Sequence, residues 1–199
     1  MTGSKELNVG GLLLAAGSSS RLRQPKQLLE FKGKTLLRHA AEALAESICD
    51  PVVVVLGAET EKSPHEIEGL SVVPCINENW KSGMSSSIKT GLAKLVEIAP
   101  EIDAVLISLC DQPLVTAEML NCFGKKFAAS GANVIAAKYN GVAGVPALFS
   151  RELFGDLSRL DGDKGARDLI RNRADLVTID LPEAAFDIDT PADKDLLDS

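Results

Sequence analysis

Two cations follow an apolar run and a turn of small residues near the start of the chain. Arg21 and Lys26 come after a segment made of Leu14, Ala15, Ala16, Gly17 and Ser18. Backbone amides in such a turn can approach a polyphosphate closely, because alanine and glycine put almost no side chain in the way. The two cations bring mobile positive charge to the same anion. The pattern predicts a nucleotide-phosphate site; without the loop, a solvated surface cluster would be the better interpretation.

A single carboxylate follows a second apolar run, in the segment Asp111-Gln112-Pro113. A carboxylate at the exposed end of a buried strand suits Mg²⁺, which takes hard oxygen ligands and often shares them with substrate phosphates. The alternative is that Asp111 caps the next helix, but Thr116 is the better candidate for that cap. We therefore predict that Asp111 is a metal ligand and a catalytic residue.

Two further carboxylates, Asp187 and Asp189, alternate with Phe186 and Ile188 close to the C-terminal end. In a strand this alternation would place both carboxylates on one side and the apolar pair toward the core. Together they could complete a metal site. Local chemistry alone favours a plainer role for Asp189, as the cap of a helix that starts at Pro191.

A glycine and three serines separate another apolar run from a helical pattern. The segment from Asn77 to Ser87 contains Asn79, Gly83, Ser85, Ser86 and Ser87. Amides at a helix N-terminus, together with hydroxyls, make a polar cradle for a base edge or a phosphate. The alternative is that Ser85 only caps the helix. The single tryptophan, Trp80, could stack on a ligand or serve in packing.

A last group of residues combines turn formers with charge. Gly144 and Pro146 punctuate one loop, and Lys164, Gly165 and Arg167 lie in another. The charged side chains could bind a phosphate or carboxylate of a second substrate. Taken alone, this pattern is also typical of a turn with ordinary surface charges.

Short apolar runs alternate with helical patterns along most of the chain, which indicates a three-layer α/β fold with a mainly parallel, Rossmann-like sheet and helices on both faces. Ligands bind at the carboxyl ends of such strands. Residues 1–199 are expected to form one domain, with a nucleotide-binding part over about 9–130 and an acceptor-binding part over about 131–199. The predicted strands are 10–14, 52–56, 72–76, 104–109, 134–137, 147–149, 176–179 and 186–188, and the predicted helices are 36–48, 84–98, 117–128, 152–159, 166–171 and 191–197.

Charge and composition exclude several classes of function. The net charge of -7 argues against nonspecific nucleic-acid binding, which needs a basic face. No apolar run is long enough to span a bilayer, and the first residues do not resemble a signal peptide, so a cytoplasmic location is expected. The four cysteines are scattered without metal-ligand spacing, which favours buried reduced thiols over zinc or disulfides.

The opening loop resembles the signature Leu-Ala-x-Gly-x-Ser-x-Arg-Met-Gly-x-x-Lys of sugar-nucleotide and cofactor nucleotidyltransferases, with Leu22-Arg23 in place of Met-Gly. Within them the chain is most similar to the molybdenum-cofactor cytidylyltransferases. The resemblance implies the nucleotide-diphospho-sugar transferase fold, Mg²⁺ held by Asp111 and Asp189, and Arg21 and Lys26 on the triphosphate. It implies that CMP passes from CTP to a molybdopterin-type acceptor with release of pyrophosphate, and that the protein contacts a molybdoenzyme or its chaperone transiently.

The same resemblance assigns the other motifs. The small residues of the first loop and the Gly-Met-Ser-x-Ser segment match the CTP-specific pattern of the family, and the acceptor side would be formed by Gln112, Gly144, Pro146, Lys164, Gly165 and Arg167. Alternatives are a guanylyltransferase or another nucleotidyltransferase with a different phosphorylated acceptor, and a nucleotide-binding domain without turnover. A P-loop built on Gly33-Lys34-Thr35 is disfavoured, because Leu28 stands where its first glycine should be.

Overall fold

The computed structural model describes residues 7–17, 25–57, 63–163, 165–171 and 173–187. They form a seven-stranded sheet in the order β5-β4-β1-β6-β8-β7-β9, together with a two-stranded hairpin. All strands of the large sheet are parallel except β8, which runs against β6 and β7. Its strands are β1 (Val9–Ala15), β4 (Cys49–Leu56), β5 (Val73–Ile76), β6 (Ala104–Leu109), β7 (Val134–Tyr139), β8 (Val142–Ser150) and β9 (Leu176–Asp180).

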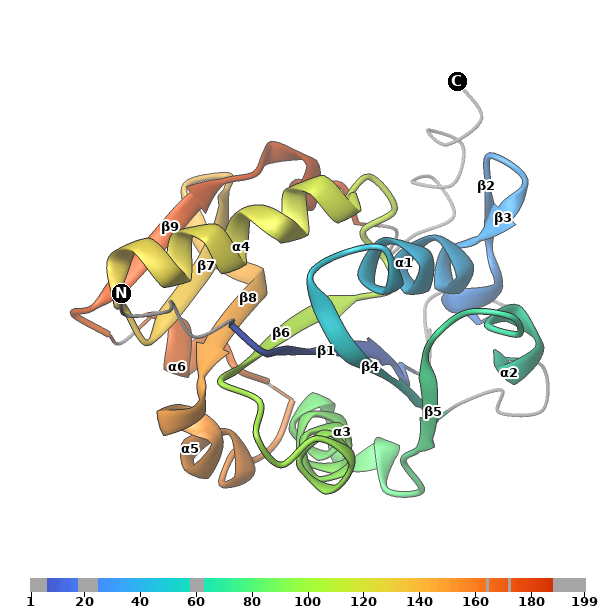
Figure 1. Cartoon of the computed structure of the whole chain (residues 1–199). Coiled ribbons are helices and arrows are strands. Elements are labelled where there is room, and N and C mark those ends of the chain that lie inside the picture. The colour runs from blue at the N-terminus through green and yellow to red at the C-terminus, as the bar shows by residue number, and fades with distance from the viewer. Residues whose placement is uncertain (1–6, 18–24, 58–62, 164, 172, 188–199) are drawn as a thin grey trace, which may run out of the picture.

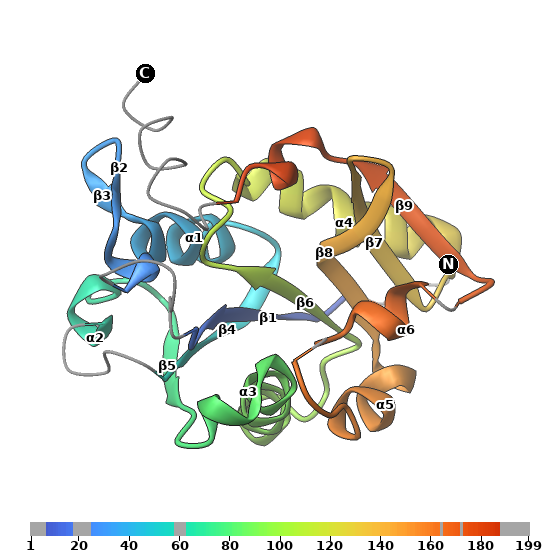
Figure 2. The same cartoon turned by 180° about the vertical axis from the view of Figure 1, so that it is seen from behind.

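Helices cover both faces of this sheet (Figure 1; Figure 2). One face carries α1 (Leu36–Ala45) and α4 (Ala117–Ser130), and the other carries α3 (Met84–Ile98), α5 (Phe154–Ser158) and α6 (Arg167–Arg171). The short helix α2 (Ser63–Glu66) lies beside α1. Each face of the sheet has its own apolar core. The structure confirms the predicted fold class. Among the described residues, no helix is long and apolar enough to cross a membrane.

The centre of the sheet places the two main motifs side by side. Every residue of β1 is buried, and β1 pairs in parallel with β4 on one side and β6 on the other. Leu14 pairs with Leu109, so the loop after β1 and the segment after β6 leave the sheet at neighbouring points. The chain order reverses at this point, which is where α/β sheets of this kind bind ligands.

The hairpin β2 (Glu30–Phe31) and β3 (Lys34–Thr35) was not predicted, and it explains the apparent P-loop glycine. Gly33 lies in the hairpin turn with φ +80°. Lys34 pairs with Glu42 at 2.6 Å, and the Thr35 hydroxyl accepts a hydrogen bond from the Arg38 amide as the cap of α1. These contacts give the segment a structural role.

Other differences from the predicted elements lie toward the C-terminal end. The two strands around Asn140-Gly141 form one hairpin, whose turn has φ +49° and +75° at these residues, as a tight hairpin turn requires. The predicted strand over 186–188 is absent at Phe186 and Asp187, which follow a 3-10 helix over Pro182–Ala185. Phe186 instead packs on a small cluster below the β2–β3 hairpin. The predicted closing helix over 191–197 lies outside the described residues.

Candidate functional site

A cavity of about 300 Å³ opens at the carboxyl ends of β1 and β6. Its volume is at the lower end of the range for small-ligand sites. The residues that line it come from the loop after β1, the start of α3, the segment after β6 and the loop before α6. They are Leu14, Ala16, Gly17, Lys26, Gln27, Trp80, Lys81, Gly83, Met84, Ser87, Leu109, Cys110, Asp111 and Asp163.

Lys26 and Asp111, which both line the cavity, form an ion pair between Nζ and Oδ2. Both side chains are largely buried, with 19% and 10% of their surface exposed. Oδ1 of Asp111 is also buried, and it has no hydrogen-bond partner among the residues described. A buried carboxylate oxygen without a partner is costly, so this oxygen is suited to a ligand. The sequence predicted that these residues meet, although they are 85 positions apart.

The described donor atoms supply one candidate ligand for a divalent cation. Asp111 Oδ1 is a hard oxygen of the kind that Mg²⁺ prefers. Among residues 7–17, 25–57, 63–163, 165–171 and 173–187, no three His, Cys, Asp or Glu side chains are grouped so that they could hold a metal ion. Asp189, the second predicted ligand, lies outside the described residues, as do Arg21 and Ser18 on the phosphate side.

Ala16 and Trp80, two residues of the cavity lining, pack closely against the backbone of Gly57. A Cβ on Gly57 would lie 2.9 Å from the Ala16 Cβ and 2.7 Å from the Trp80 Cβ, so this backbone passes directly beneath the two side chains. Leu14, Ala16 and Gly17 reach the cavity, whereas Ala15 is a buried strand residue. Trp80 both lines the cavity and packs against the apolar core on the α3 face.

The serines at the start of α3 have separate roles. Gly83 is the cap residue, and Ser85 does not cap the helix: its hydroxyl is buried without a partner in the described structure. Ser86 lies in a buried network, near the carbonyls of Gly83 (2.8 Å) and Asn79 (3.0 Å). Of the three serines, Ser87 lines the cavity.

Asn77 is the hydrogen-bond partner that connects the residues of this network. It is 1% exposed, and its Nδ2 donates to Ser86 Oγ at 2.8 Å and to Ser87 Oγ at 3.0 Å. Its Oδ1 accepts from the Asn79 amide at 3.0 Å, which places Asn79 in the support of the cavity rather than in its lining. The predicted nucleobase segment is therefore held by its own first residue, Asn77, to which the sequence analysis gave no separate role.

The predicted acceptor residues Gln112, Gly144 and Pro146 lie at the same edge of the sheet, on the β8 side. Gln112 is 3% exposed and donates from Nε2 to the carbonyls of Val145 (3.2 Å) and Ala184 (2.8 Å). Val145 and Pro146 form a bulge in β8 opposite Ala136–Ala137, where a proline costs no ladder hydrogen bond. The segment after Asp111 is thereby tied to the β7–β8 hairpin.

Tyr139, at the end of β7, is a residue of this edge that sequence reasoning missed. Its hydroxyl lies 2.6 Å from the position that a Cβ on Gly144 would take. Burial raises the pKa of Tyr139, and the carboxylates of Asp187 and Asp111 act in the same direction. No sequence pattern marked this tyrosine.

The loop before α6, which was predicted to belong to the acceptor site, also contacts the start of α3. Gly165, with φ +57°, packs so closely on the first residue of α3 that a Cβ would lie 2.6 Å from the Met84 sulfur. Arg167, at the start of α6, is close enough to Tyr139 to act on its pKa. Lys164 is outside the described residues. The loop therefore bridges the start of α3 and the β7–β8 hairpin.

The cysteines do not form a redox or metal centre in the part of the chain that the structure describes. All four are free, and the expectation of buried thiols holds for Cys49 and Cys110, whereas Cys75 is half-buried and Cys122 is exposed. Burial raises the pKa of Cys110, next to Asp111, to about 12. This thiol is therefore neutral at the edge of the cavity.

Comparison with protein families identifies the family of this chain. A model described as the MobA-like NTP transferase domain matches residues 11–177. This chain belongs to that family. A relative named nicotine blue oxidoreductase, from Paenarthrobacter nicotinovorans, is 41% identical over 108 residues, which are 53% of this chain and 50% of that protein. The purine catabolism protein PucB of Bacillus subtilis is 29% identical over 94% of both chains.

Solved structures agree with the family assignment. Rv0371c of Mycobacterium tuberculosis aligns over 98% of this chain and 100% of its own, with a TM-score of 0.80 and 27% identity. Its homologue from Mycobacterium sp. strain JC1 is 33% identical, with a TM-score of 0.78 over 96% of this chain and 95% of that chain. Another structure of Rv0371c, 26% identical with a TM-score of 0.76 over 96% of this chain and 97% of its own, is described as a complex with manganese. The resemblance found in the motifs is thus confirmed for the family.

Proposed function

We propose that this chain transfers CMP from CTP to a molybdopterin-type acceptor and releases pyrophosphate. The observation that carries the proposal is the Lys26–Asp111 pair in the cavity lining, with one buried carboxylate oxygen that has no partner among the described residues. The family supports nucleotidyl transfer. The choice of CTP rests on the Leu-Ala-Ala-Gly and Gly-Met-Ser-x-Ser segments.

Each residue of the pair has a distinct role in the proposal. Asp111, assisted by Asp189, would hold Mg²⁺, which supplies positive charge at the α-phosphate and the leaving diphosphate. Lys26, joined by Arg21, donates to the phosphate oxygens and neutralises the charge that builds there. Lys26 lies beside the same carboxylate, so it reaches the phosphates without a large movement of the backbone.

The nucleophile is a phosphate oxygen of the acceptor, which attacks the α-phosphorus in line while the bond to the diphosphate breaks. The acceptor would lie at the β8 edge, against Gln112, Gly144 and Pro146, with Lys164, Gly165 and Arg167 completing its site. Such a transfer needs no covalent enzyme intermediate, because positioning and electrostatics supply most of the acceleration.

The test measures pyrophosphate released from CTP or GTP in the presence of Mg²⁺ and molybdopterin. We expect CTP to be the better donor and Asp111→Asn to lower the rate by a factor of at least ~10². Asp156→Asn is the matched control, since Asp156 is a surface carboxylate paired with Arg159 on α5.

Three outcomes would contradict parts of the proposal. An unchanged rate in Asp111→Asn removes that residue from the mechanism. Preference for GTP would make this chain a guanylyltransferase, as the relative named probable molybdenum cofactor guanylyltransferase of Bacillus cytotoxicus suggests (27% identical over 57% of this chain and 54% of that protein). Nucleotide binding without pyrophosphate release would indicate a binding domain.

A further inference from the structure

The loop that precedes α6 is fastened to the start of α3 by close backbone contacts. The Ser85 amide donates to the Gly162 carbonyl at 3.2 Å. Oδ1 of Asp163 lies 2.3 Å from the position that a Cβ on Gly83 would take, and the Gly162 carbonyl oxygen lies 2.7 Å from it. Gly83 therefore has to be glycine for this loop to dock. The docking holds the Asp163 carboxylate at the start of the helix.

Asp163 also lines the cavity that contains Lys26 and Asp111. The proposed function places the triphosphate at the end formed by Gly17, Lys26 and Asp111, and the present inference rests on that placement. The nucleobase would then lie toward the lining residues that come from the start of α3 and from the loop before α6, which form the base end of the cavity: Trp80, Lys81, Gly83, Met84, Ser87 and Asp163. A carboxylate thus faces the base.

None of the other polar side chains at this end is a fixed acceptor for an amino group, since Lys81 only donates hydrogen bonds. The Ser87 hydroxyl can donate or accept, because its hydrogen rotates. Lys81 extends over the Trp80 ring, with Nζ 5.5 Å from the ring centroid. Among the described residues that line this end, Asp163 is the side chain that only accepts hydrogen bonds when ionised.

We propose that Asp163 accepts a hydrogen bond from the exocyclic amino group of the nucleobase and thereby sets the base specificity of the site. Cytosine presents an amino donor at N4, which aspartate can accept. Uracil carries a carbonyl oxygen at the same position, and two acceptors facing each other repel. The site therefore selects amino-bearing bases and rejects uracil. Asp163 directly precedes Lys164 and Gly165, which the sequence analysis assigned to the acceptor.

The test measures nucleotide affinity alone, so it does not depend on turnover or on the acceptor. Trp80, the only tryptophan, lines the cavity, and its fluorescence reports occupancy by CTP or UTP. We expect the unmodified protein to prefer CTP over UTP by roughly 10- to 100-fold, less than a fully buried site would achieve because Asp163 is exposed. In Asp163→Asn the amide can also donate, so the preference should fall to within about threefold.

Asp161→Asn is the matched control in the same loop. Its Oδ1 accepts from the Gly162 amide at 2.9 Å, and the residue does not line the cavity. This variant should retain the preference for CTP. An unaltered preference in Asp163→Asn, an equal loss of affinity for both nucleotides, or the absence of nucleotide binding by the unmodified protein would overturn the proposal.

The inference and the proposed reaction fail in different ways. If CTP binds with the expected preference but no pyrophosphate appears, the reaction is wrong and the role of Asp163 stands. If GTP binds best, the comparison is made with inosine triphosphate, which lacks the amino group, and Asp163→Asn should remove the difference. If pyrophosphate forms equally well from CTP and UTP, the reaction stands and the role of Asp163 is wrong.

Discussion

The two faces of the sheet differ in what their helices bury. The residues that α1 and α4 bury are all apolar or glycine, and they form a plain core against the sheet. Helix α3, on the opposite face, buries three serines in its first turns and continues with apolar residues only afterwards. Both faces use the same layered architecture (Figure 1; Figure 2). The face with α1 and α4 stabilises the sheet, whereas the face with α3 also forms part of the cavity lining.

Replacing a glycine in the middle of a helix should give the largest difference in stability between the two faces. A Cβ on Gly91 of α3 would lie 2.2 Å from Leu12 Cδ1 and 2.6 Å from Val55 Cγ2, and both side chains are fully buried. Gly91→Ala should therefore lower the free energy of unfolding by about 3 kcal/mol. The measurement is unfolding in urea, followed by far-ultraviolet circular dichroism.

Gly124→Ala in α4 is the matched control. Its Cβ would lie 2.0 Å from Ile48 Cδ1, a closer approach than in α3, but Ile48 is 36% exposed and can swing into solvent. Alanine also favours a helix over glycine by about 1 kcal/mol. The stability should change by less than about 1 kcal/mol. Equal losses in the two variants would show that the α4 face is packed as rigidly as the α3 face.

Replacing one asparagine on each face should give the second-largest difference, in both stability and CTP affinity. Asn77→Ala removes the partner of Ser86, Ser87 and the Asn79 amide, and should cost about 2 kcal/mol of stability. Since Ser87 lines the cavity, the affinity for CTP should fall as well. Both quantities can be obtained from Trp80 fluorescence, by urea unfolding and by nucleotide titration.

On the other face, Asn121 Oδ1 accepts from the Ile48 amide at 2.7 Å. Asn121→Ala should cost about 1 kcal/mol and leave the CTP affinity unchanged. A loss of CTP affinity in this variant would show that the α4 face also shapes the cavity. Full CTP affinity in Asn77→Ala would show that the buried network does not contribute to nucleotide binding.

The parts of the molecule that were predictable follow from short-range patterns. Parallel strands buried on both faces appear as apolar runs, so β1, β4 and β6 were found, and their carboxyl ends brought Gly17, Lys26 and Asp111 together as expected. The cap of α4 by Thr116 was also predicted correctly, because capping depends on the few residues around a helix start. Local chemistry and the periodicity of the strands determine these features.

The parts that were not predictable depend on contacts between distant segments. The docking of Gly162 and Asp163 onto Gly83 joins residues about 80 positions apart, and nothing in either segment specifies the other. The strand expected at Phe186 failed for a related reason: alternating residues suit a strand only where a partner strand is available, and Phe186 instead found an apolar cluster. The two-residue strands β2 and β3 are too short to show a period.

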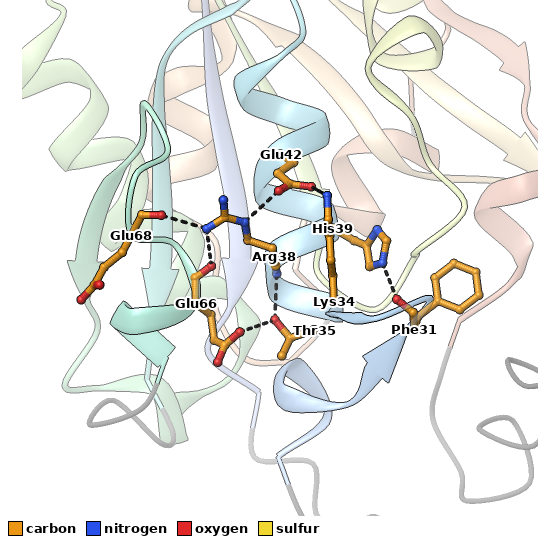
Figure 3. A network of polar contacts seen from close by, with 8 residues as sticks. All are labelled: Phe31, Lys34, Thr35, Arg38, His39, Glu42, Glu66 and Glu68. Carbon is orange, nitrogen blue, oxygen red and sulfur yellow. Dashed lines mark hydrogen bonds and ion pairs between the residues drawn. The ribbon is translucent and has the colours of Figure 1, made fainter.

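The smallest expected effect concerns the ionic network at the N-terminal end of α1, on the face without the cavity. Arg38 donates to Glu42 at 2.8 Å and to the Glu66 and Glu68 carbonyls, so it links α1 to the α2 segment (Figure 3). Lys34 also donates to Glu42, at 2.6 Å, from the β2–β3 hairpin. Glu42 thus connects the hairpin to α1.

The pKa of Glu42 lies below its ordinary value, chiefly because of the hydrogen bond from Lys34; burial opposes this, and Arg38 adds to the lowering. A carboxyl whose pKa is lower in the folded state stabilises the fold above the unfolded pKa of about 4.3, and this stabilisation is lost as the pH falls through the lower folded value. Solvent screens the pair, so its contribution should be about 0.5 kcal/mol.

Glu42→Gln should remove this contribution to the pH dependence of stability, which is expected between about pH 5 and 3. The measurement is urea unfolding at a series of pH values. Glu97→Gln is the control, because Glu97 pairs with Lys94 on the exposed side of α3. If the two variants lost stability in parallel at every pH, the network at α1 would contribute no more than an ordinary surface pair.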